Sequence, residues 1–261
     1  MDLEAVKKTY SQVGSALIEK LYSEDYLSIG GTASTDILAD YAGITKKSRV
    51  LDIGSGLGGP ALHLAGSRGC RITGLDLIST NVEQAQCRAE DRGLQNLADF
   101  QIGNATELPF NSNSFDVVWG QDAWCHVPDK AKLISECARV LTPRGTVAFS
   151  DWLKTAEMNP AQSEKIHEAT ASTNLATKAL YCELLYENGL SIEKHEDISD
   201  IFIEQYRRII ARLEGIEKEI SEQFSLKVYQ ILQKKNVTIL HGFEEGLIGG
   251  SRIIATHQPT I

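Results

Sequence analysis

RVLDIGSGLGG, residues 49–59, and RITGLDL, residues 71–77, are the stretches that decide the fold. Each begins as a short run typical of a strand and ends in residues typical of a tight turn. Three alternate glycines in the first stretch carry no Cβ, so the backbone can turn sharply and lie against a ligand, and Pro60 suits the first turn of a helix. The second strand ends on Asp76, 22 residues beyond Gly54, where a carboxylate can accept both hydroxyls of a ribose. These two strand ends predict a nucleoside site.

The spacing of the glycines separates two classes of cofactor. Dinucleotide folds carry G-x-G-x-x-G, in which a helix N-terminus holds a pyrophosphate. Here the run is D-I-G-S-G-L-G, and the acid before its first glycine, Asp52, would repel a pyrophosphate. That acid suits a cofactor with an ammonium and a sulfonium group. The stretch resembles motif I of the class I S-adenosylmethionine-dependent methyltransferases, and the resemblance implies S-adenosyl-L-methionine as the cofactor.

Composition limits the class of partner. The 261 residues carry a formal net charge of -9, and no block of Lys or Arg is long enough to follow a nucleic-acid backbone. Neither a signal peptide nor an apolar run of about 20 residues is visible. The five cysteines are scattered and never form C-x-x-C, which indicates neither a disulfide framework nor a metal site. We expect a cytoplasmic monomer or homodimer that acts on a small-molecule methyl acceptor, with no nucleic-acid or membrane partner.

Strand and helix patterns alternate through most of the chain, which predicts an α/β protein. Beyond the two opening strands, further elements are predicted for helices 35–42, 79–92 (capped by Ser79 or Thr80) and 129–141, and for strands 98–102, 114–119, 146–150, 191–194 and 251–256. The fold class is a Rossmann-like, doubly wound, mostly parallel seven-stranded sheet. We expect a helical lid over residues 1–31, a cofactor-binding core over 32–155, and the remainder of the sheet over 156–261, with an amphipathic helical insertion at 199–235 before the last strand.

GNATELPF, residues 103–110, follows the third strand and resembles the adenine-site motif of the same family. Many relatives carry Asp where Asn104 stands. The side-chain carbonyl of Asn104 can still accept a hydrogen bond from the adenine amino group. The alternative is an ordinary Asn turn.

QDAWCH, residues 121–126, lies just past the fourth strand, at the sheet edge where open parallel sheets bind their ligands. Methyl transfer to nitrogen needs a free lone pair in line with the sulfonium, and a protonated amine has none. His126 can act as the base and Asp122 can orient the amine. The alternative for His126 is a loop imidazole that is hydrogen-bonded by backbone. Trp124 and Trp152 can face a methylated cation or simply pack.

Three motifs narrow the resemblance: YLSIGG at 26–31, DIGSGLGG at 52–59 and QDAWCH at 121–126. Together they resemble the phosphoethanolamine methyltransferases and their relatives that act on sarcosine and dimethylglycine. The resemblance implies that Tyr10 and His126 form a catalytic pair and that Asp122 contacts the substrate amine. It implies that the cofactor is bound by Ser28, Asp52, Gly54, Ser55, Gly56, Asp76, Leu77, Asn104, Ala105 and Gln121.

One departure from the phosphobase enzymes concerns the acceptor. The residues that hold the substrate phosphate in that family have no counterparts in EATASTNLATKALY or GFEEGLIGG. We therefore expect N-methylation of a small amine or amino acid such as glycine, sarcosine or dimethylglycine, with Arg207, Arg208 or Lys178 as candidate partners for a carboxylate. The alternatives are methylation of carbon, oxygen or sulfur in a small natural product, methylation of phosphoethanolamine, and a non-catalytic protein that binds the cofactor.

Overall fold

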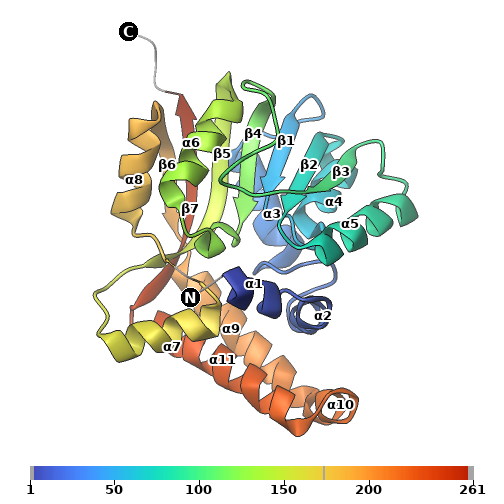
Figure 1. Ribbon diagram of the computed structural model, residues 1–261, viewed down its shortest axis with the longest axis vertical. Helices are drawn as coiled ribbons and strands as arrows, with labels where there is room; N and C mark the ends of the chain where they lie inside the picture. The colour runs from blue at the N-terminus through green and yellow to red at the C-terminus, as the bar shows by residue number, and fades with distance from the viewer. Residues whose placement is uncertain (1–2, 173, 258–261) are drawn as a thin grey trace.

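The computed structural model describes residues 3–172 and 174–257 and is built on one seven-stranded sheet (Figure 1). Its strands are β1 (Arg49–Ile53), β2 (Arg71–Asp76), β3 (Ala98–Ile102), β4 (Phe115–Gln121), β5 (Leu141–Lys154), β6 (Leu190–Asp197) and β7 (Ile248–His257). They lie in the order β3-β2-β1-β4-β5-β7-β6, and β7 runs antiparallel to both of its neighbours while the other pairs are parallel. The predicted Rossmann-like, mostly parallel sheet is confirmed.

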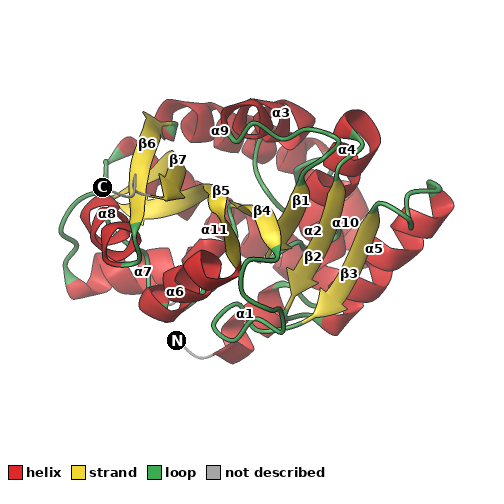
Figure 2. Ribbon diagram, turned by 90° about the horizontal axis from the view of Figure 1, so that it is seen from above, coloured by secondary structure: helices red, strands yellow, loops and turns green. Residues whose placement is uncertain are grey.

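Helices cover both faces of the sheet (Figure 2). One face carries α3 (Gly31–Tyr41), α4 (Gly59–Arg68) and α5 (Ser79–Asp91), and the other carries α6 (Lys130–Val140) and α8 (Lys178–Glu187). The remaining helical elements are α1 (Leu3–Thr9), α2 (Gln12–Leu21), η1 (Trp124–His126), α7 (Pro160–Thr170), α9 (Ser199–Gly215), α10 (Glu217–Gln223) and α11 (Leu226–Glu244). Within the described residues, none of these helices combines the length and apolar character required to span a bilayer.

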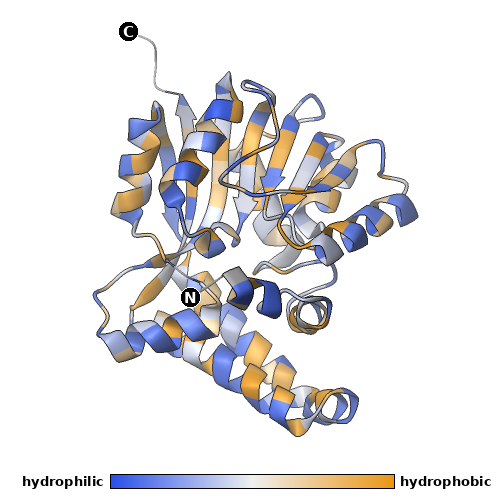
Figure 3. Cartoon of the chain, in the orientation of Figure 1, coloured by the Kyte–Doolittle hydropathy of each residue, from blue (hydrophilic) through white to orange (hydrophobic). Residues whose placement is uncertain are grey.

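The side chains of the central strands alternate between two cores. In β4, Val117 and Trp119 pack with α3, α4 and α5, whereas Val118 packs with α6 and α8. Successive side chains of a strand point to opposite faces, so a strand buried on both faces is hydrophobic along its whole length. Figure 3 shows hydrophobic colour over parts of the inner strands, interrupted by hydrophilic and neutral bands, while α9 and α11 carry alternating hydrophilic and hydrophobic bands.

The amphipathic pattern at 199–235 becomes α9, α10 and part of α11, which lie together beyond one end of the sheet (Figure 1). Figure 1 also places α1 and α2 between the sheet and these helices, and α2 contacts α9. Trp152 of β5 makes edge contacts with Phe202, Tyr206 and Phe243. Of its two predicted alternatives, Trp152 therefore shows the packing role.

Several element boundaries differ from the prediction. The helix expected at 35–42 begins at Gly31, and the strand expected at 146–150 extends over Leu141–Lys154. At its C-terminal end the strand is longer because β7 pairs with it up to residue 154, and at its N-terminal end Leu141 pairs with Phe115 of β4. The predicted cap of α5 by Ser79 or Thr80 is wrong. The helix has Ile78 at its cap position with no side-chain cap, and the Ile78 amide donates to Asp76 Oδ1 at 2.9 Å.

Candidate active site

A cavity of about 1000 Å³, including its open mouth, lies at the carboxyl ends of β1, β2 and β4. The strand order reverses between β1 and β4, and open α/β sheets bind ligands at this point. All the residues predicted to be catalytic or to bind the cofactor line this one cavity: Tyr10, Asp122 and His126, with Ser28, Asp52, Gly54, Ser55, Gly56, Asp76, Leu77, Asn104, Ala105 and Gln121. The fold therefore brings together residues from the N-terminal segment, from the turns after β1, β2 and β3, and from the loop after β4.

The turn after β1 has to be made of glycine for two reasons. Gly54 and Gly56 have φ angles of 81° and 53°, a region that residues with a Cβ rarely adopt. A Cβ on Gly54 would lie 2.5 Å from the Cβ of Ala123, and one on Gly56 would lie 3.0 Å from Leu27 Cδ1. The amide of Gly56 donates to Asp76 Oδ2 at 2.8 Å, so the two strand ends predicted to form the site are joined directly.

Several buried polar atoms in the cavity lack a partner among the described residues. They are Ser28 Oγ, Asp52 Oδ2, Ser55 Oγ and Gln121 Nε2. The side-chain oxygen of Gln121 accepts from Thr35 Oγ1 at 2.9 Å, which leaves its amide nitrogen as a free donor. Each unpaired buried polar group costs about 1–3 kcal/mol, so a ligand that pairs with it gains that free energy. A molecule with an ammonium and a carboxylate, such as S-adenosylmethionine, fits this mixture of donors and acceptors.

The carboxyl groups of the cavity favour a cation once they are ionised. Burial raises the pKa of Asp52 to about 8, with a further contribution from the charge of Asp76. Burial also raises the pKa of Asp76, although amide donors such as those of Ile78 and Gly56 oppose that shift. Of the described residues that line the cavity, none is an Arg or a Lys. An ammonium or sulfonium group would therefore meet acidic side chains there without a competing cation.

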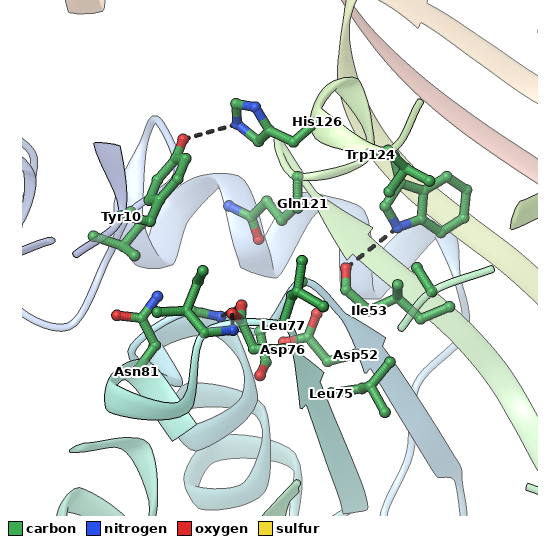
Figure 4. A pocket seen from close by; sticks show the side chains of 18 of the residues that line it. Tyr10, Asp52, Ile53, Leu75, Asp76, Leu77, Asn81, Gln121, Trp124 and His126 are labelled. Atoms are coloured by element: carbon green, nitrogen blue, oxygen red, sulfur yellow. Dashed lines mark hydrogen bonds between the residues drawn. The ribbon is translucent and has the colours of Figure 1, made fainter. Parts of the chain in front are cut away.

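Tyr10 and His126 both line the cavity, and their side chains point toward each other, as Figure 4 shows. The Tyr10 hydroxyl lies 2.8 Å from His126 Nε2, and His126 Nδ1 lies 3.2 Å from the carbonyl oxygen of Ala171. A carbonyl can only accept, so Nδ1 carries the proton, and Nε2 accepts from the Tyr10 hydroxyl. Burial lowers the pKa of His126 to about 4, which keeps the imidazole neutral, and burial raises the pKa of Tyr10 well above its usual value.

Asp122 has both carboxylate oxygens engaged. Its Oδ2 accepts from the Ile29 amide at 2.8 Å and its Oδ1 accepts from Ser150 Oγ at 2.5 Å. Burial raises the pKa of Asp122 to about 6, while these two hydrogen bonds lower it. The backbone of Asp122 has a φ of 55°, an unusual value for a residue with a side chain. The carboxylate thus ties the segment between α2 and α3 to the end of β4.

The side-chain oxygen of Asn104, which was predicted to accept from adenine, already has hydrogen-bond donors within the protein. Asn104 Oδ1 accepts from both the amide and the hydroxyl of Thr106, at 3.0 and 2.9 Å. The oxygen expected to accept from adenine is therefore occupied by the Asn turn that the sequence left as the alternative. Asn104 still lines the cavity with Ala105 and Leu77. Trp124 lines it too, although its ring stacks on Phe149 and is fully buried.

The lining residues that the sequence did not predict include Val6, Leu27 and Asn81. Asn81 is buried, accepts from Ser15 Oγ at 2.9 Å and hydrogen-bonds to Asp76. Asn81 stands five residues after Asp76, at the start of the helix that follows the predicted ribose site. This position in the sequence could have indicated that Asn81 lines the cavity. Val6 comes from the N-terminal helical pattern, which carries no comparable signal, whereas Leu27 lies inside the motif YLSIGG, residues 26–31, and that motif was the available signal.

Comparison with known proteins agrees with this geometry. A family model described as a methyltransferase domain matches residues 51–149. The 27-O-demethylrifamycin SV methyltransferase of Amycolatopsis mediterranei is 31% identical over 77% of this chain and 75% of that protein. The chain belongs to the class I S-adenosylmethionine-dependent methyltransferases. The predicted family and cofactor are thereby confirmed.

Two further similarities bear on this methyltransferase. The glycine/sarcosine/dimethylglycine N-methyltransferase of Actinopolyspora halophila is 32% identical over 73% of this chain, which spans about a third (34%) of that protein's length. Phosphoethanolamine N-methyltransferase 2 of Haemonchus contortus, solved with phosphomonomethylethanolamine and S-adenosylhomocysteine, superposes with a TM-score of 0.89. The superposition covers 97% of this chain and 60% of the Haemonchus chain. At 22% identity, it shows that the two proteins share a fold.

Proposed function

We propose that this methyltransferase methylates the nitrogen of a small amine, with Tyr10, His126 and Asp122 acting on the acceptor. The observation that carries the proposal is the hydrogen bond between Tyr10 and a neutral His126 beside a cavity that holds unpaired polar groups. When bound, S-adenosylmethionine supplies a methyl group on a positively charged sulfur. The similarity to a glycine/sarcosine/dimethylglycine N-methyltransferase supports nitrogen as the acceptor atom.

The cofactor-binding residues form one side of this proposal. Asp52 would accept from an ammonium group, and Gln121 Nε2 would donate to a carboxylate, because these buried atoms otherwise lack partners among the described residues. Asp76 would accept from the ribose hydroxyls. Its carboxylate already accepts from the amides of Gly56 and Ile78, which fixes its orientation and leaves further lone pairs on each oxygen.

The acceptor residues form the other side. An acceptor that arrives as an ammonium must lose a proton to expose its lone pair, and the neutral Nε2 of His126 is able to take one. The Tyr10 hydroxyl donates to Nε2 and both residues line the cavity, so we propose that Tyr10 accepts a proton from the ammonium form of the acceptor as it passes its own proton to His126. Asp122 would attract the ammonium form of the acceptor to this position, because its buried carboxylate has no cation in contact within the cavity lining described here.

The charge of the lining supports an acceptor without a phosphate. Two of the cations considered from the sequence pair elsewhere: Arg207 with Glu244 and Arg208 with Glu204. Neither of them lines the cavity, and nor does Lys178. A phosphate needs several charge-assisted donors to leave water. A carboxylate on the acceptor would have to use neutral donors, so an amine without an anionic group fits best.

O-methylation of a natural-product hydroxyl is the second candidate. The relative of which this chain covers 75% is a rifamycin methyltransferase whose name specifies an oxygen acceptor. Apolar side chains such as Val6, Leu27 and Val127 line the cavity, and they suit a less polar molecule. The same Tyr10–His126 pair would take the hydroxyl proton.

The organisation of the chain completes the proposal. We retain residues 1–31 as a lid, 32–155 as the cofactor-binding core and 156–261 as the remainder of the sheet with its substrate-side helices. The lid contributes Tyr10 and Ser28, so closing it would shield the reaction from water. The net charge of -9 supports a small molecule rather than nucleic acid as the partner, and we propose a cytoplasmic monomer or homodimer.

A panel assay with methyl-labelled cofactor tests the acceptor. The panel contains glycine, sarcosine, dimethylglycine, phosphoethanolamine, methionine, uncharged amines and phenolic hydroxyls. We expect label on an amine, with phosphoethanolamine a poor acceptor. Label only on hydroxyls would replace the proposal with the second candidate. Calorimetric binding of the cofactor with no transfer to any acceptor would contradict catalysis and support a binding protein.

A further inference from the structure

Lys130, the first residue of α6, is a buried cation that the proposed reaction does not use. Only 3% of its surface is exposed. Its ammonium donates to the backbone carbonyl oxygens of Val127 and Asn174, the latter at 2.8 Å. Burying an ammonium is costly, and neither of these partners is a carboxylate that would neutralise it. The role of Lys130 is therefore to be sought in the two backbone segments that its ammonium joins.

The two carbonyls belong to the two stretches of backbone that hold His126. Val127 follows His126 directly in the loop after β4. Asn174 lies between α7 and α8, in the same connection as Ala171, whose carbonyl oxygen accepts from His126 Nδ1. One ammonium thus joins the backbone that carries the imidazole to the backbone that orients it.

The residue before His126 is anchored in a similar way. The amide of Cys125 donates to Asp151 Oδ1 at 2.8 Å, and the Tyr181 hydroxyl donates to Asp151 Oδ2 at 2.7 Å. Asp151 is fully buried, and its charge opposes the lowering by burial of the Lys130 pKa. The backbone on both sides of His126 is therefore held by buried groups of opposite charge that do not line the cavity.

We infer that Lys130 is a positioning residue, which holds the His126 loop against the connection between α7 and α8 so that Nε2 faces Tyr10. The inference rests on the proposed function, because it assumes that His126 acts on the acceptor. Without the ammonium, the carbonyls of Val127 and Asn174 lose their shared donor and the two backbones can separate. The hydrogen bond from Nδ1 to Ala171 then weakens, and the imidazole can turn or change its tautomer.

Lys130→Met tests this, because Met keeps the unbranched side chain to within one atom of its length and removes the donors. The matched control is Lys132→Met, which makes the same change at an exposed position of the same helix. We expect Lys130→Met to lower kcat about 10- to 100-fold and to leave the Kd of S-adenosylmethionine within about threefold. The control is expected to stay within about twofold in both.

A second readout does not depend on turnover. Nitrogen NMR of the histidine rings, with the His126 signals assigned by loss in His126→Gln, reports which ring nitrogen carries the proton. We expect the Nδ1-protonated form in the wild type and a mixture of tautomers in Lys130→Met. This measurement stands even if no amine in the panel is methylated, so failure of the proposed function and failure of the positioning role give different results.

Two results would overturn the inference. One is an unchanged His126 ring spectrum in Lys130→Met with kcat within threefold of wild type. The other is a parallel loss of kcat, cofactor affinity and thermal stability, which a general structural role would give. If Lys130→Met does not fold, Lys130→Arg replaces it. Its longer side chain keeps the charge and donors but moves the two carbonyls apart, so a smaller loss of kcat and an altered ring spectrum are expected, and an unaltered spectrum is contradictory.

Discussion

The two sides of the cavity differ in how far their polar atoms are already paired. On the cofactor side, Ser28, Asp52, Ser55 and Gln121 each present a buried atom with no partner among the described residues. On the acceptor side, the reactive atoms are engaged: Tyr10 with His126, His126 with Ala171, and Asp122 with Ile29 and Ser150.

This difference indicates that the two sides do different work when a ligand binds. Unpaired buried groups gain hydrogen bonds from a ligand without losing any, so the cofactor side is organised in advance. The groups of the acceptor side already have partners, so an acceptor has to share or displace existing hydrogen bonds rather than satisfy unpaired ones. Substitutions on the two sides should therefore affect different quantities, binding on one and turnover on the other.

The largest expected effect is on the acceptor side. His126→Ala should lower kcat by about 10² to 10⁴, because it removes the nitrogen that accepts from the Tyr10 hydroxyl, and should change cofactor affinity little. Tyr10→Phe combined with it should lose little more than the worse single variant, because groups that act as one unit are not additive. Single-turnover rates at saturating acceptor, with exposed His241→Ala as the control, provide the measurement. A rate within threefold of wild type would leave Asp122 as the remaining candidate.

The next effect is on the cofactor side. Asp76→Ala removes the proposed acceptor of two ribose hydroxyls and should weaken S-adenosylmethionine binding by roughly 2–3 kcal/mol, or about 30- to 150-fold. Calorimetry measures this, with circular dichroism to confirm the fold. Asp99→Ala, at an exposed carboxylate of the adjacent strand β3, is the matched control. Unchanged affinity in a folded Asp76→Ala would remove this residue from the site.

The pH dependence of binding tests Asp52. With its pKa raised to about 8, the carboxyl is mostly protonated at neutral pH in the free protein, whereas an ammonium ligand prefers the carboxylate. Affinity for S-adenosylmethionine should therefore rise up to tenfold per pH unit and level off above about pH 8. Asp52→Asn should remove the part of this pH dependence that comes from Asp52. The titration of the ligand itself contributes equally to the wild type and the variant, so it cancels in the comparison. An identical slope in the variant would contradict the role of Asp52.

The same shift has a consequence for stability, measured without ligand. The folded state holds the Asp52 proton more tightly than the unfolded state, whose carboxyl has a pKa near 3.8. Between this value and about pH 8, the free energy of unfolding should fall as pH rises. Denaturant unfolding of Asp52→Asn should show a shallower decline than the wild type over this range.

The smallest effect on binding is expected from loosening the lid, which contributes Ser28 to the cofactor side and Tyr10 to the acceptor side. Arg88 Nη1 of α5 contacts Glu19 Oε1 and Asp25 Oδ1, each at 2.8 Å, and so holds the N-terminal segment against the core. Cofactor should slow hydrogen exchange over residues 3–31, and Arg88→Ala should reverse part of that protection and weaken binding about three- to tenfold. Arg49→Ala, which breaks an exposed pair with Asp116, is the control. Equal exchange with and without cofactor would show a segment that is already fixed.

Much of the cofactor side could be predicted from the sequence because its determinants are local. The glycines after β1, the acid at the end of β2 and the polar residues after β3 and β4 each stand next to the strand that positions them. Parallel strands bring their carboxyl ends to one edge of a sheet, so strand order and a few turn residues imply a shared site. The sheet itself followed from the alternation of strand and helix patterns.

The acceptor side depends on contacts between distant parts of the chain, which no local pattern encodes. The residues Tyr10 and His126 were predicted from family resemblance, but the pairing of Nδ1 with Ala171 depends on a connection 45 residues further along. The same holds for the occupied oxygen of Asp122 and for the bridge that Lys130 makes to Asn174. The sequence by itself predicted the sheet, the cofactor turn and, through family resemblance, the residues that we propose as reactive, all of which line the cavity. Only the tertiary structure decided which of their atoms are free, because a hydrogen-bond partner is chosen by proximity in space and by what burial leaves without water.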